Sequence, residues 1–185
     1  MAQSKFIQAV KDEAKGRPRS TQWYRDKIKE FGTPTTLDLI RDGKRDKKPF
    51  YGKLNMFVYD PKFKKQLPYY DTFPLVLPLE TYSDGFLGIN FHYLPIPLRV
   101  KLLDRLVDFS NNTKFDESTR LVVDYSKLKN VNIVKPTIHK YLAGQTKSQF
   151  RRIDADEFTI ATLLPVQRFK KAAASVVWKE SRAMI

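Results

Sequence analysis

The chain has 185 residues, 42% of them hydrophobic, and a formal net charge of +14. It has no cysteine, which excludes disulfides and thiolate metal sites, and no apolar run approaches the roughly 18 residues of a membrane span. The first residues lack the apolar run of a signal peptide, so we expect a soluble intracellular protein. Residues 51–100 are nearly neutral between basic flanks, which favours a polyanionic partner, chiefly nucleic acid or an acidic protein, over a merely solvated surface.

The N-terminal region is predicted to hold two short helices and an arm. Apolar spacing and glycine stops indicate helices over residues 4–15 and 20–31. Residues 32–53 are rich in glycine, proline and charge, which predicts a basic arm that orders only against a neighbouring chain or DNA. We therefore divide the chain into residues 1–53, with helices and arm, and residues 54–185, a single α+β domain with a C-terminal amphipathic helix.

A small antiparallel sheet is predicted over residues 54–94. The run LNMFVY at 54–59 has the composition of a strand, and a turn at 83–85 leads to another strand at 86–94. In the strand between them, the prolines share one parity, so their missing N–H donors would lie along one edge and mark an edge strand: Pro68, Pro74 and Pro78. The opposite parity predicts a buried face: Phe73, Leu75, Leu77 and Leu79.

Helices are predicted to follow the sheet. Pro97 suits the first turn of a helix that closes at residues 110–112. Residues 116–129 are equally consistent with a strand or a helix. Three more helices are expected, over residues 136–142, from Asp154 or Asp156 to about 164, and over about 167–183. Strands joined by turns and followed by helices predict an α+β fold with helices packed on one face of the sheet.

No catalytic constellation is evident in the sequence. Neither His92 nor His139 has a second histidine or a carboxylate at metal-ligand spacing, and no nucleophile or phosphate-binding motif occurs. The carboxylates of the central region lack the pattern of a magnesium-dependent nuclease: Asp60, Asp71, Glu80 and Asp84. We therefore expect no enzymatic activity, no metal and no cofactor.

Two basic clusters are the candidate nucleic-acid-binding residues, because cations beside aromatic rings suit phosphate neutralisation and base stacking. The first contains Lys44, Arg45, Lys47 and Lys48, flanked by Phe50 and Tyr51. Two helix junctions would bring together the second: Lys147, Arg151, Arg152, Arg168, Lys170 and Lys171. No motif for sequence-specific recognition accompanies them, so contacts to the phosphates of duplex DNA are expected.

Three segments carry a resemblance to a known family: MFVYDPKFKKQLPYYDTFPLVLPL, GFLGINFHYLPIPLR and RFKKAAASVVWKESRAMI. Over residues 50–182 the chain resembles the DNA end protector family of T4-like bacteriophages. The resemblance implies a non-enzymatic virion protein, made in the host cytoplasm, that binds the terminus of packaged double-stranded DNA and shields it from exonuclease. It also implies a role in head completion and head–tail joining beside portal or neck proteins. The alternative is a tail, neck or baseplate protein that docks acidic subunits without DNA contact. Neither reading involves a membrane or a small-molecule substrate.

Overall fold

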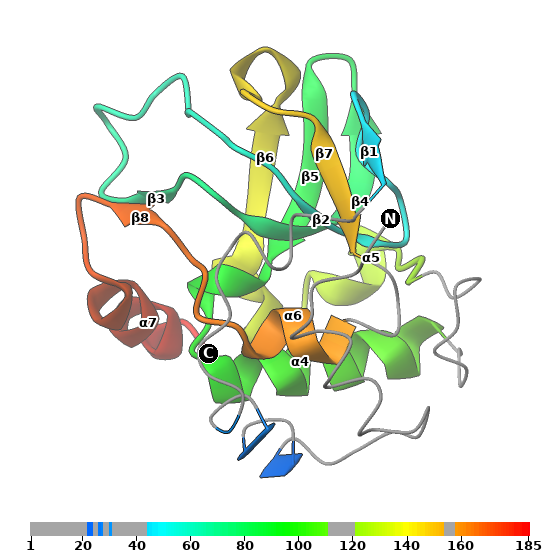
Figure 1. The fold of residues 1–185 in the computed structure, drawn as a ribbon, viewed down its shortest axis with the longest axis vertical. Coiled ribbons are helices and arrows are strands. Elements are labelled where there is room, and N and C mark those ends of the chain that lie inside the picture. Colours follow the sequence, from blue (N-terminus) through cyan, green and yellow to red (C-terminus); the bar gives the residue numbers. More distant parts are fainter. Residues whose placement is uncertain (1–21, 24–25, 28–29, 31–43, 111–120, 154–157) are drawn as a thin grey trace.

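A six-stranded sheet is the centre of the computed structural model, which describes residues 22–23, 26–27, 30, 44–110, 121–153 and 158–185 (Figure 1). The strand order is β1-β7-β2-β4-β5-β6, and neighbouring strands pair antiparallel. The strands are β1 (Arg45–Asp46), β2 (Leu54–Met56), β4 (Leu75–Tyr82), β5 (Gly85–Asn90), β6 (Ile138–Leu142) and β7 (Phe150–Ile153). A separate two-stranded sheet pairs β3 (Tyr70–Asp71) with β8 (Phe169–Lys170).

Helices cover one side of this sheet, which confirms the α+β class (Figure 1). The α-helices are α4 (Ile96–Ser110), α5 (Tyr125–Leu128), α6 (Phe158–Leu163) and α7 (Ala174–Ala183). The 3₁₀ helices are η1 (Phe91–Tyr93), η2 (Asn132–Thr137) and η3 (Ala143–Gln145). No helix within the described ranges is long and apolar enough to cross a membrane.

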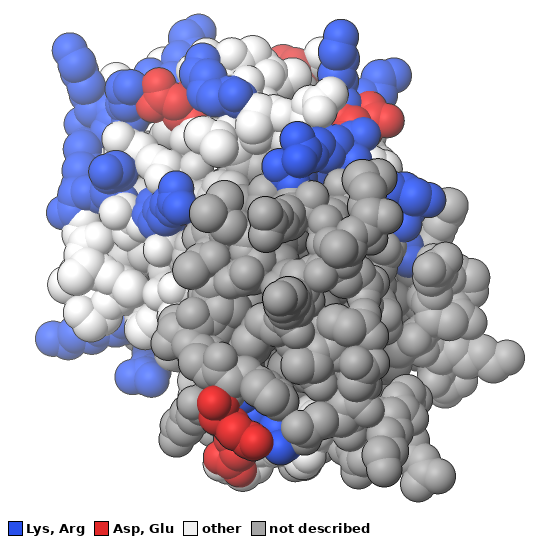
Figure 2. All heavy atoms as spheres, viewed as in Figure 1, with Lys and Arg blue, Asp and Glu red and all other residues white. Residues whose placement is uncertain are grey.

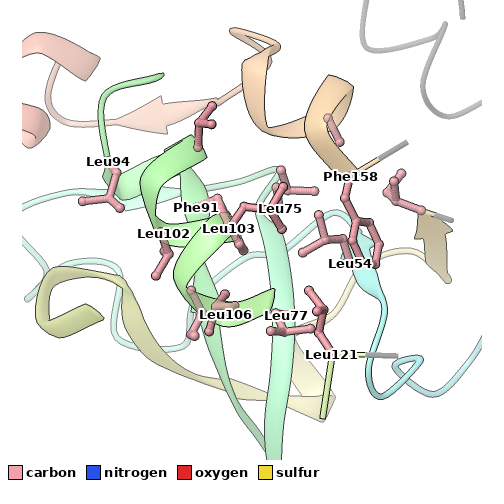
Figure 3. Close-up of a cluster of buried hydrophobic side chains, with 14 of the residues drawn as sticks. Leu54, Leu75, Leu77, Phe91, Leu94, Leu102, Leu103, Leu106, Leu121 and Phe158 are labelled. Atoms are coloured by element: carbon pink, nitrogen blue, oxygen red, sulfur yellow. The ribbon is translucent and has the colours of Figure 1, made fainter. Parts of the chain in front are cut away.

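The main core lies between β4 and α4 (Figure 3). Leu75 and Leu77 point from alternate positions of β4 toward the helix, and both are fully buried, as the sequence predicted. α4 contributes the other half of this layer, with Leu102, Leu103 and Leu106. Burial of each such side chain contributes about 1.5–3 kcal/mol relative to its exposed state. The helix therefore fixes the position of the sheet beneath it.

The other face of the sheet buries an aromatic cluster, which shows that the sheet is curled. Phe57 follows β2 and lies near the middle of the strand order, yet its ring contacts Tyr141 of β6 and Phe150 of β7. The centroid distances are 5.3 and 4.6 Å. A flat sheet would keep β6 and β7 apart, because three strands separate them in the order. Curling allows both faces to be dry, so this sheet has two hydrophobic layers.

The prediction that the proline-containing strand lies at an edge of the sheet is wrong, because β4 lies between β2 and β5. β2 pairs only with the first two residues of β4, before Pro78 is reached. The register against β5 also shifts between Pro78 and Glu80. A bulge leaves backbone groups outside the ladder, so it accepts a residue without an N–H donor. Pro68 and Pro74 precede β3 and β4 and lie in neither strand.

The helix predicted over residues 136–142 is also wrong. Pro136 lies inside η2, which ends at the next residue, and residues 138–142 then form β6. The register of β6 against β5 runs from Gly85 opposite Leu142 to Ile89 opposite Ile138. This long-range pairing outweighs the local preference for a helix after a proline.

The C-terminal helix begins later than predicted. Phe169 and Lys170 pair with β3, and Lys171 has a φ of 70°, so the expected helix over 167–183 starts only at Ala174. The strand expected over 86–94 likewise ends at Asn90, whose side chain accepts a hydrogen bond from the His92 backbone N–H and begins η1.

The predicted N-terminal arm divides into two parts. Residues 44–53 belong to the folded body, because β1 pairs with β7 and Lys53 is buried, so they do not need a partner to order. Most of residues 1–43, including the helix expected over 4–15, lie outside the described residues. The described positions between 22 and 30 are helical, and Trp23 packs on the main core. Whether residue 53 is a domain boundary stays a prediction.

Candidate nucleic-acid interface

The pairing of β1 with β7 joins residues of the two predicted basic clusters. Arg45 lies directly opposite Arg151 in the ladder, and the Arg152 N–H donates to the Lys44 carbonyl oxygen over 2.8 Å. Segments about a hundred residues apart in the chain thus place four cationic side chains on adjacent strands. Because successive side chains of a strand point to opposite faces, Arg45 and Arg151 share one face of the strand pair, and Lys44 and Arg152 belong to the other. We call these four residues at the edge of the sheet the β1–β7 basic surface. The sequence predicts that helix junctions bring the second cluster together, but in the structure Arg151 and Arg152 lie on a strand.

Repulsion within this surface is evident at Arg151. Like charges directly opposite each other in an antiparallel pair are destabilising. Partial burial, followed by the positive charge of Arg45, lowers the pKa of Arg151. Its Nη1 atom is buried and has no hydrogen-bond partner within the described chain. An anion bound beside the pair would offset the repulsion between the two guanidinium groups.

A turn beside β1 presents aromatic residues to the same surface. Asn55 holds this turn, because its side chain accepts from the Phe50 N–H at 2.8 Å and donates to the Phe50 carbonyl oxygen at 2.9 Å. The Arg152 guanidinium lies 5.9 Å from the centre of the Phe50 ring. Tyr51 is partly exposed, and its hydroxyl accepts a hydrogen bond from Thr81 over 2.7 Å. Of the two rings, Tyr51 is therefore the one available to a ligand.

Three lysines predicted in the clusters lie on loops around these strands. Lys47 and Lys48 follow β1 in a turn in which the Asp46 carboxylate accepts from the Lys48 N–H. Lys147 precedes β7, and its backbone N–H donates to the Val58 carbonyl oxygen over 2.8 Å. Lys47, Lys48 and Lys147 are all exposed. All three extend the basic character of this end of the sheet.

The remaining predicted residues belong to a different place, the β3–β8 sheet. Arg168 lies with its guanidinium 5.2 Å from the centre of the Phe73 ring. Lys170 pairs with Tyr70 and is exposed. The Lys171 ammonium donates to the carbonyl oxygens of residues 65 and 67. These side chains therefore do not form one patch with Arg151, and Lys171 has a clear structural role.

The surface view shows how these charges are distributed. Lysine and arginine side chains follow the upper and left borders of the visible face, with few acidic groups among them (Figure 2). Between them lies uncharged surface. A spread of positive charge over several loops and strand ends fits a ligand with many repeated negative charges better than it fits a single small anion.

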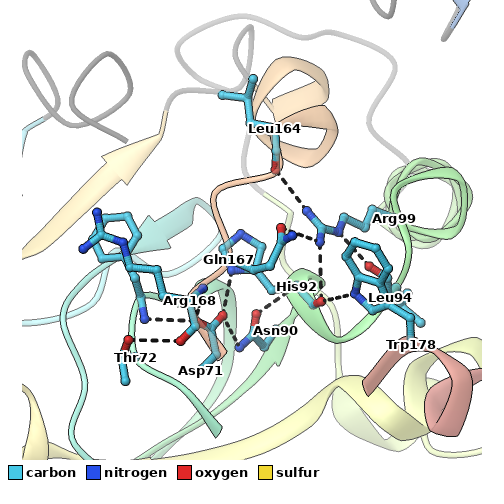
Figure 4. A network of polar contacts seen from close by, with 11 residues as sticks. Asp71, Thr72, Asn90, His92, Leu94, Arg99, Leu164, Gln167, Arg168 and Trp178 are labelled. Atoms are coloured by element: carbon cyan, nitrogen blue, oxygen red, sulfur yellow. Dashed lines mark hydrogen bonds and ion pairs between the residues drawn. The ribbon is translucent and has the colours of Figure 1, made fainter. Parts of the chain in front are cut away.

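A buried polar network fixes the β3–β8 sheet to the rest of the fold (Figure 4). Asp71 is its centre, because one carboxylate oxygen accepts from the N–H groups of Phe73 and Arg168. The other oxygen lies 2.7 Å from the His92 Nδ1 atom and 3.4 Å from the Asn90 amide. Asp71 and His92 are almost completely buried.

Arg99 extends the network to the C-terminal segment. Its guanidinium donates to the carbonyl oxygens of Leu94 and Leu164 and to the Gln167 side chain, at 2.8 to 3.1 Å. The Trp178 indole N–H donates to the His92 carbonyl oxygen over 2.9 Å. The network thus links β3, η1, α4 and α7, and it holds the backbone that carries Arg168.

The electrostatics of the Asp71–His92 pair favour an ionised carboxylate beside a neutral imidazole. Burial alone would raise the pKa of Asp71, but His92 and two backbone N–H donors outweigh it and hold that pKa below its usual value. Burial also lowers the pKa of His92 against the opposing pull of Asp71. His92 therefore donates its Nδ1 proton to Asp71. Burial lowers the pKa of Arg99 to about 9, so its guanidinium is charged at neutral pH.

One protein family matches nearly the whole chain. A family model described as the phage T4 terminal DNA protecting protein matches residues 3–181. The chain belongs to this family. The match confirms the predicted resemblance to DNA end protectors of T4-like phages, and it extends into the N-terminal region that the three quoted segments do not cover. No curated protein and no solved structure matches the chain.

This member of the terminal DNA protecting family therefore has a basic strand pair and a buried Asp71–His92–Arg99 network. Sequence reasoning missed the network, because Asp71 and His92 lie 21 residues apart and belong to different elements. The pair is enclosed, so we interpret it as a positioning device. Among the described residues, no group of three or more metal-ligating side chains is present.

Proposed function

We propose that this chain is a non-enzymatic virion protein that binds the end of packaged double-stranded DNA and shields it from exonuclease. The β1–β7 basic surface is the observation that carries the proposal. Membership of a family described by the protection of DNA termini supports it. Duplex DNA presents the closely spaced phosphates that this strand pair, with its opposed Arg45 and Arg151, would bind.

Head completion and head–tail joining form the second part of the proposal. A protein bound at the last-packaged DNA end would lie beside the portal or neck, where tails attach. Exposed apolar side chains outside the basic surface, Val122 and Val176 among them, would contact neighbouring virion proteins. The same residues support the alternative, a neck, tail or baseplate subunit whose basic surface docks acidic protein without DNA.

Salt-dependent binding of a short duplex, measured by fluorescence anisotropy, tests the DNA contact. The logarithm of the binding constant should fall linearly with the logarithm of salt concentration, by about 0.9 per phosphate contacted. The double variant Arg45→Gln/Arg151→Gln should lower that slope by about 2. A matched control, Lys101→Gln/Arg105→Gln, removes two exposed charges from α4 and should leave the slope unchanged. Salt-independent binding, or no binding at low salt, would instead support the protein-docking alternative.

A further inference from the structure

A cleft of about 600 Å³ lies between the loop of residues 61–67 and β6. β6 is at the opposite end of the strand order from β1. The volume falls in the range of about 300–1,000 Å³ that small-molecule sites occupy. Aromatic side chains dominate its lining: Tyr59, Phe63, Tyr70, Tyr93, His139 and Tyr141. Such a concentration of rings around an open cleft suits a flat ligand that stacks.

The outer wall of the cleft is held in place before any ligand binds. Lys171 adopts its positive φ next to β8 and donates to the carbonyl oxygens of Lys65 and Leu67, at 3.0 and 2.7 Å. Within the loop, the Leu67 N–H donates to the Phe63 carbonyl oxygen. The Phe63 side chain is nevertheless 55% exposed. The anchored loop therefore holds a large ring in solvent, where a ligand can contact it.

Cations accompany the rings. The Lys62 ammonium lies 5.5 Å from the centre of the Phe63 ring, and both residues line the cleft. Lys140 lines the other wall, where it pairs with Asp84 at 2.8 Å. Deeper inside, the His139 ring lies against Tyr93, with centroids 4.0 Å apart. Rings inside and ammonium groups beside them match a nucleotide, whose base stacks while its phosphate pairs with lysine.

We propose that this cleft takes one unpaired terminal nucleotide of the bound DNA, an inference that rests on the proposed function. The base would enter between Phe63 and the β6 wall, and Lys62 would contact the adjacent phosphate. In the interior of a duplex, a base must be unpaired and unstacked at a cost of a few kcal/mol before it can enter such a site. At an end the last nucleotide frays or overhangs, so that cost largely disappears.

The cleft would let the protein distinguish a DNA end from the interior of a duplex, which the basic surface cannot do. Phosphates are the same at the end and in the middle of a duplex, so contacts to them give affinity without end preference. A site for an unpaired base is filled only where the DNA has an unpaired base, as at a frayed or overhanging end. Lys140 is already paired with Asp84, so Lys62 is the lining cation that favours this occupant over an apolar peptide, which would use the rings but would gain nothing from an ammonium group.

Photo-crosslinking tests the placement directly. Iodouracil is incorporated as a single unpaired nucleotide at the end of a duplex, the complex with the full chain is irradiated, and the crosslinked peptides are identified by mass spectrometry. The expected crosslinks fall on peptides that contain Phe63, Tyr70 or His139. Iodouracil paired in the middle of the same duplex should not label these peptides. Crosslinks confined to β1 and β7, or equal labelling from both positions, would overturn the inference while the proposed function stands.

A substitution provides a second, independent readout. Phe63→Ala removes an exposed ring and should leave the fold and the affinity for closed circular duplex unchanged. The preference for a duplex with one unpaired terminal nucleotide over that circle should fall about tenfold, because stacking on one ring carries that order of affinity. Val176→Ala, an exposed apolar change on α7, should leave the preference intact. An unchanged preference in Phe63→Ala would refute the cleft assignment, and a chain that binds neither DNA would refute both proposals.

Discussion

Single buried polar residues decide how the C-terminal segment sits on the sheet. Asp71 accepts hydrogen bonds from both its own strand segment and the Arg168 backbone, so its carboxylate fixes where β8 begins. Arg99 then holds the end of α6 through the Leu164 carbonyl oxygen. Removal of either side chain would leave buried donors or acceptors without partners, at about 1–3 kcal/mol for each group. These residues thus position Arg168 and Lys171.

His139 should make the free energy of unfolding depend on pH. Burial lowers the pKa of His139 to about 4, against the opposing effects of the Pro136 carbonyl oxygen and Asp71. An unfolded histidine titrates near 6.5, so the stability from neutral His139 is complete above that pH and is lost as the pH falls toward 4. The slope contributed is at most about 1.4 kcal/mol per pH unit.

His139→Gln should therefore flatten the pH dependence of the free energy of unfolding between pH 6.5 and 4. Glutamine can still donate to the Pro136 carbonyl oxygen, which His139 Nε2 contacts at 3.2 Å. Urea titrations followed by circular dichroism at several pH values measure the slope. His92, whose pKa is lowered as well, leaves a residual slope in the variant. An identical slope in the variant and the parent would contradict the assignment to His139.

At the scale of elements, the close approach of β5 and β6 depends on glycine. A Cβ atom at Gly85 would collide with the Tyr141 backbone carbonyl oxygen across the ladder. At Gly88 it would meet the Val76 side chain of β4, the neighbour on the other side of β5. β6 carries Tyr141 of the aromatic cluster and several residues of the cleft. The spacing of these two strands therefore shapes both the second core and the proposed nucleotide site.

Gly85→Ala should lower the free energy of unfolding by about 1–3 kcal/mol, because backbone atoms must move to admit the methyl group. Gly144→Ala is the matched control, since nothing lies within 4 Å of the added Cβ atom. That change should stay within about 0.5 kcal/mol of the parent. Urea unfolding of the two variants gives the comparison. Equal effects at both positions would show that the β5–β6 spacing is not tight.

Elements with strong local signals were predictable from the sequence. A strand within LNMFVY, the turn before Gly85 and the helix near Pro97 all occur. The helix ends at Ser110 as expected, whereas β2 stops at Met56 and β5 at Asn90, short of the predicted ends. The elements that failed depend on distant partners. β6 forms because β5 is available to it, and β8 forms because β3 is, and neither pairing has a signal within the segment itself.

The sequence predicted which residue types make up the candidate site, but not how those residues are arranged in space. Arg45 and Arg151 could be named as basic residues beside aromatic ones, but their direct opposition follows from the β1–β7 register. Arg168 and Lys171 are predicted in the same cluster, and the structure places them on either side of β8, in the other sheet. Asp71 and His92 carry no spacing that would have paired them, because loop length does not determine which buried groups meet.

Across the whole molecule, two regions of one curled sheet would carry two separate tasks in DNA binding. The β1–β7 basic surface would supply affinity through phosphates, and the aromatic cleft beside β6 would supply preference for an end. The cores on both sheet faces keep these regions in fixed positions. Under the proposed function, this arrangement would let the protein block the DNA terminus sterically.

Exonuclease protection tests this central claim most directly. A linear duplex is digested by a processive exonuclease, and the surviving full-length fraction is measured with the full chain, with Arg45→Gln/Arg151→Gln and with the Lys101→Gln/Arg105→Gln control. We predict protection at protein amounts near the number of ends, independent of duplex length, with loss only in the β1–β7 variant. Undiminished digestion, or protection that requires protein in proportion to duplex length, would contradict the account.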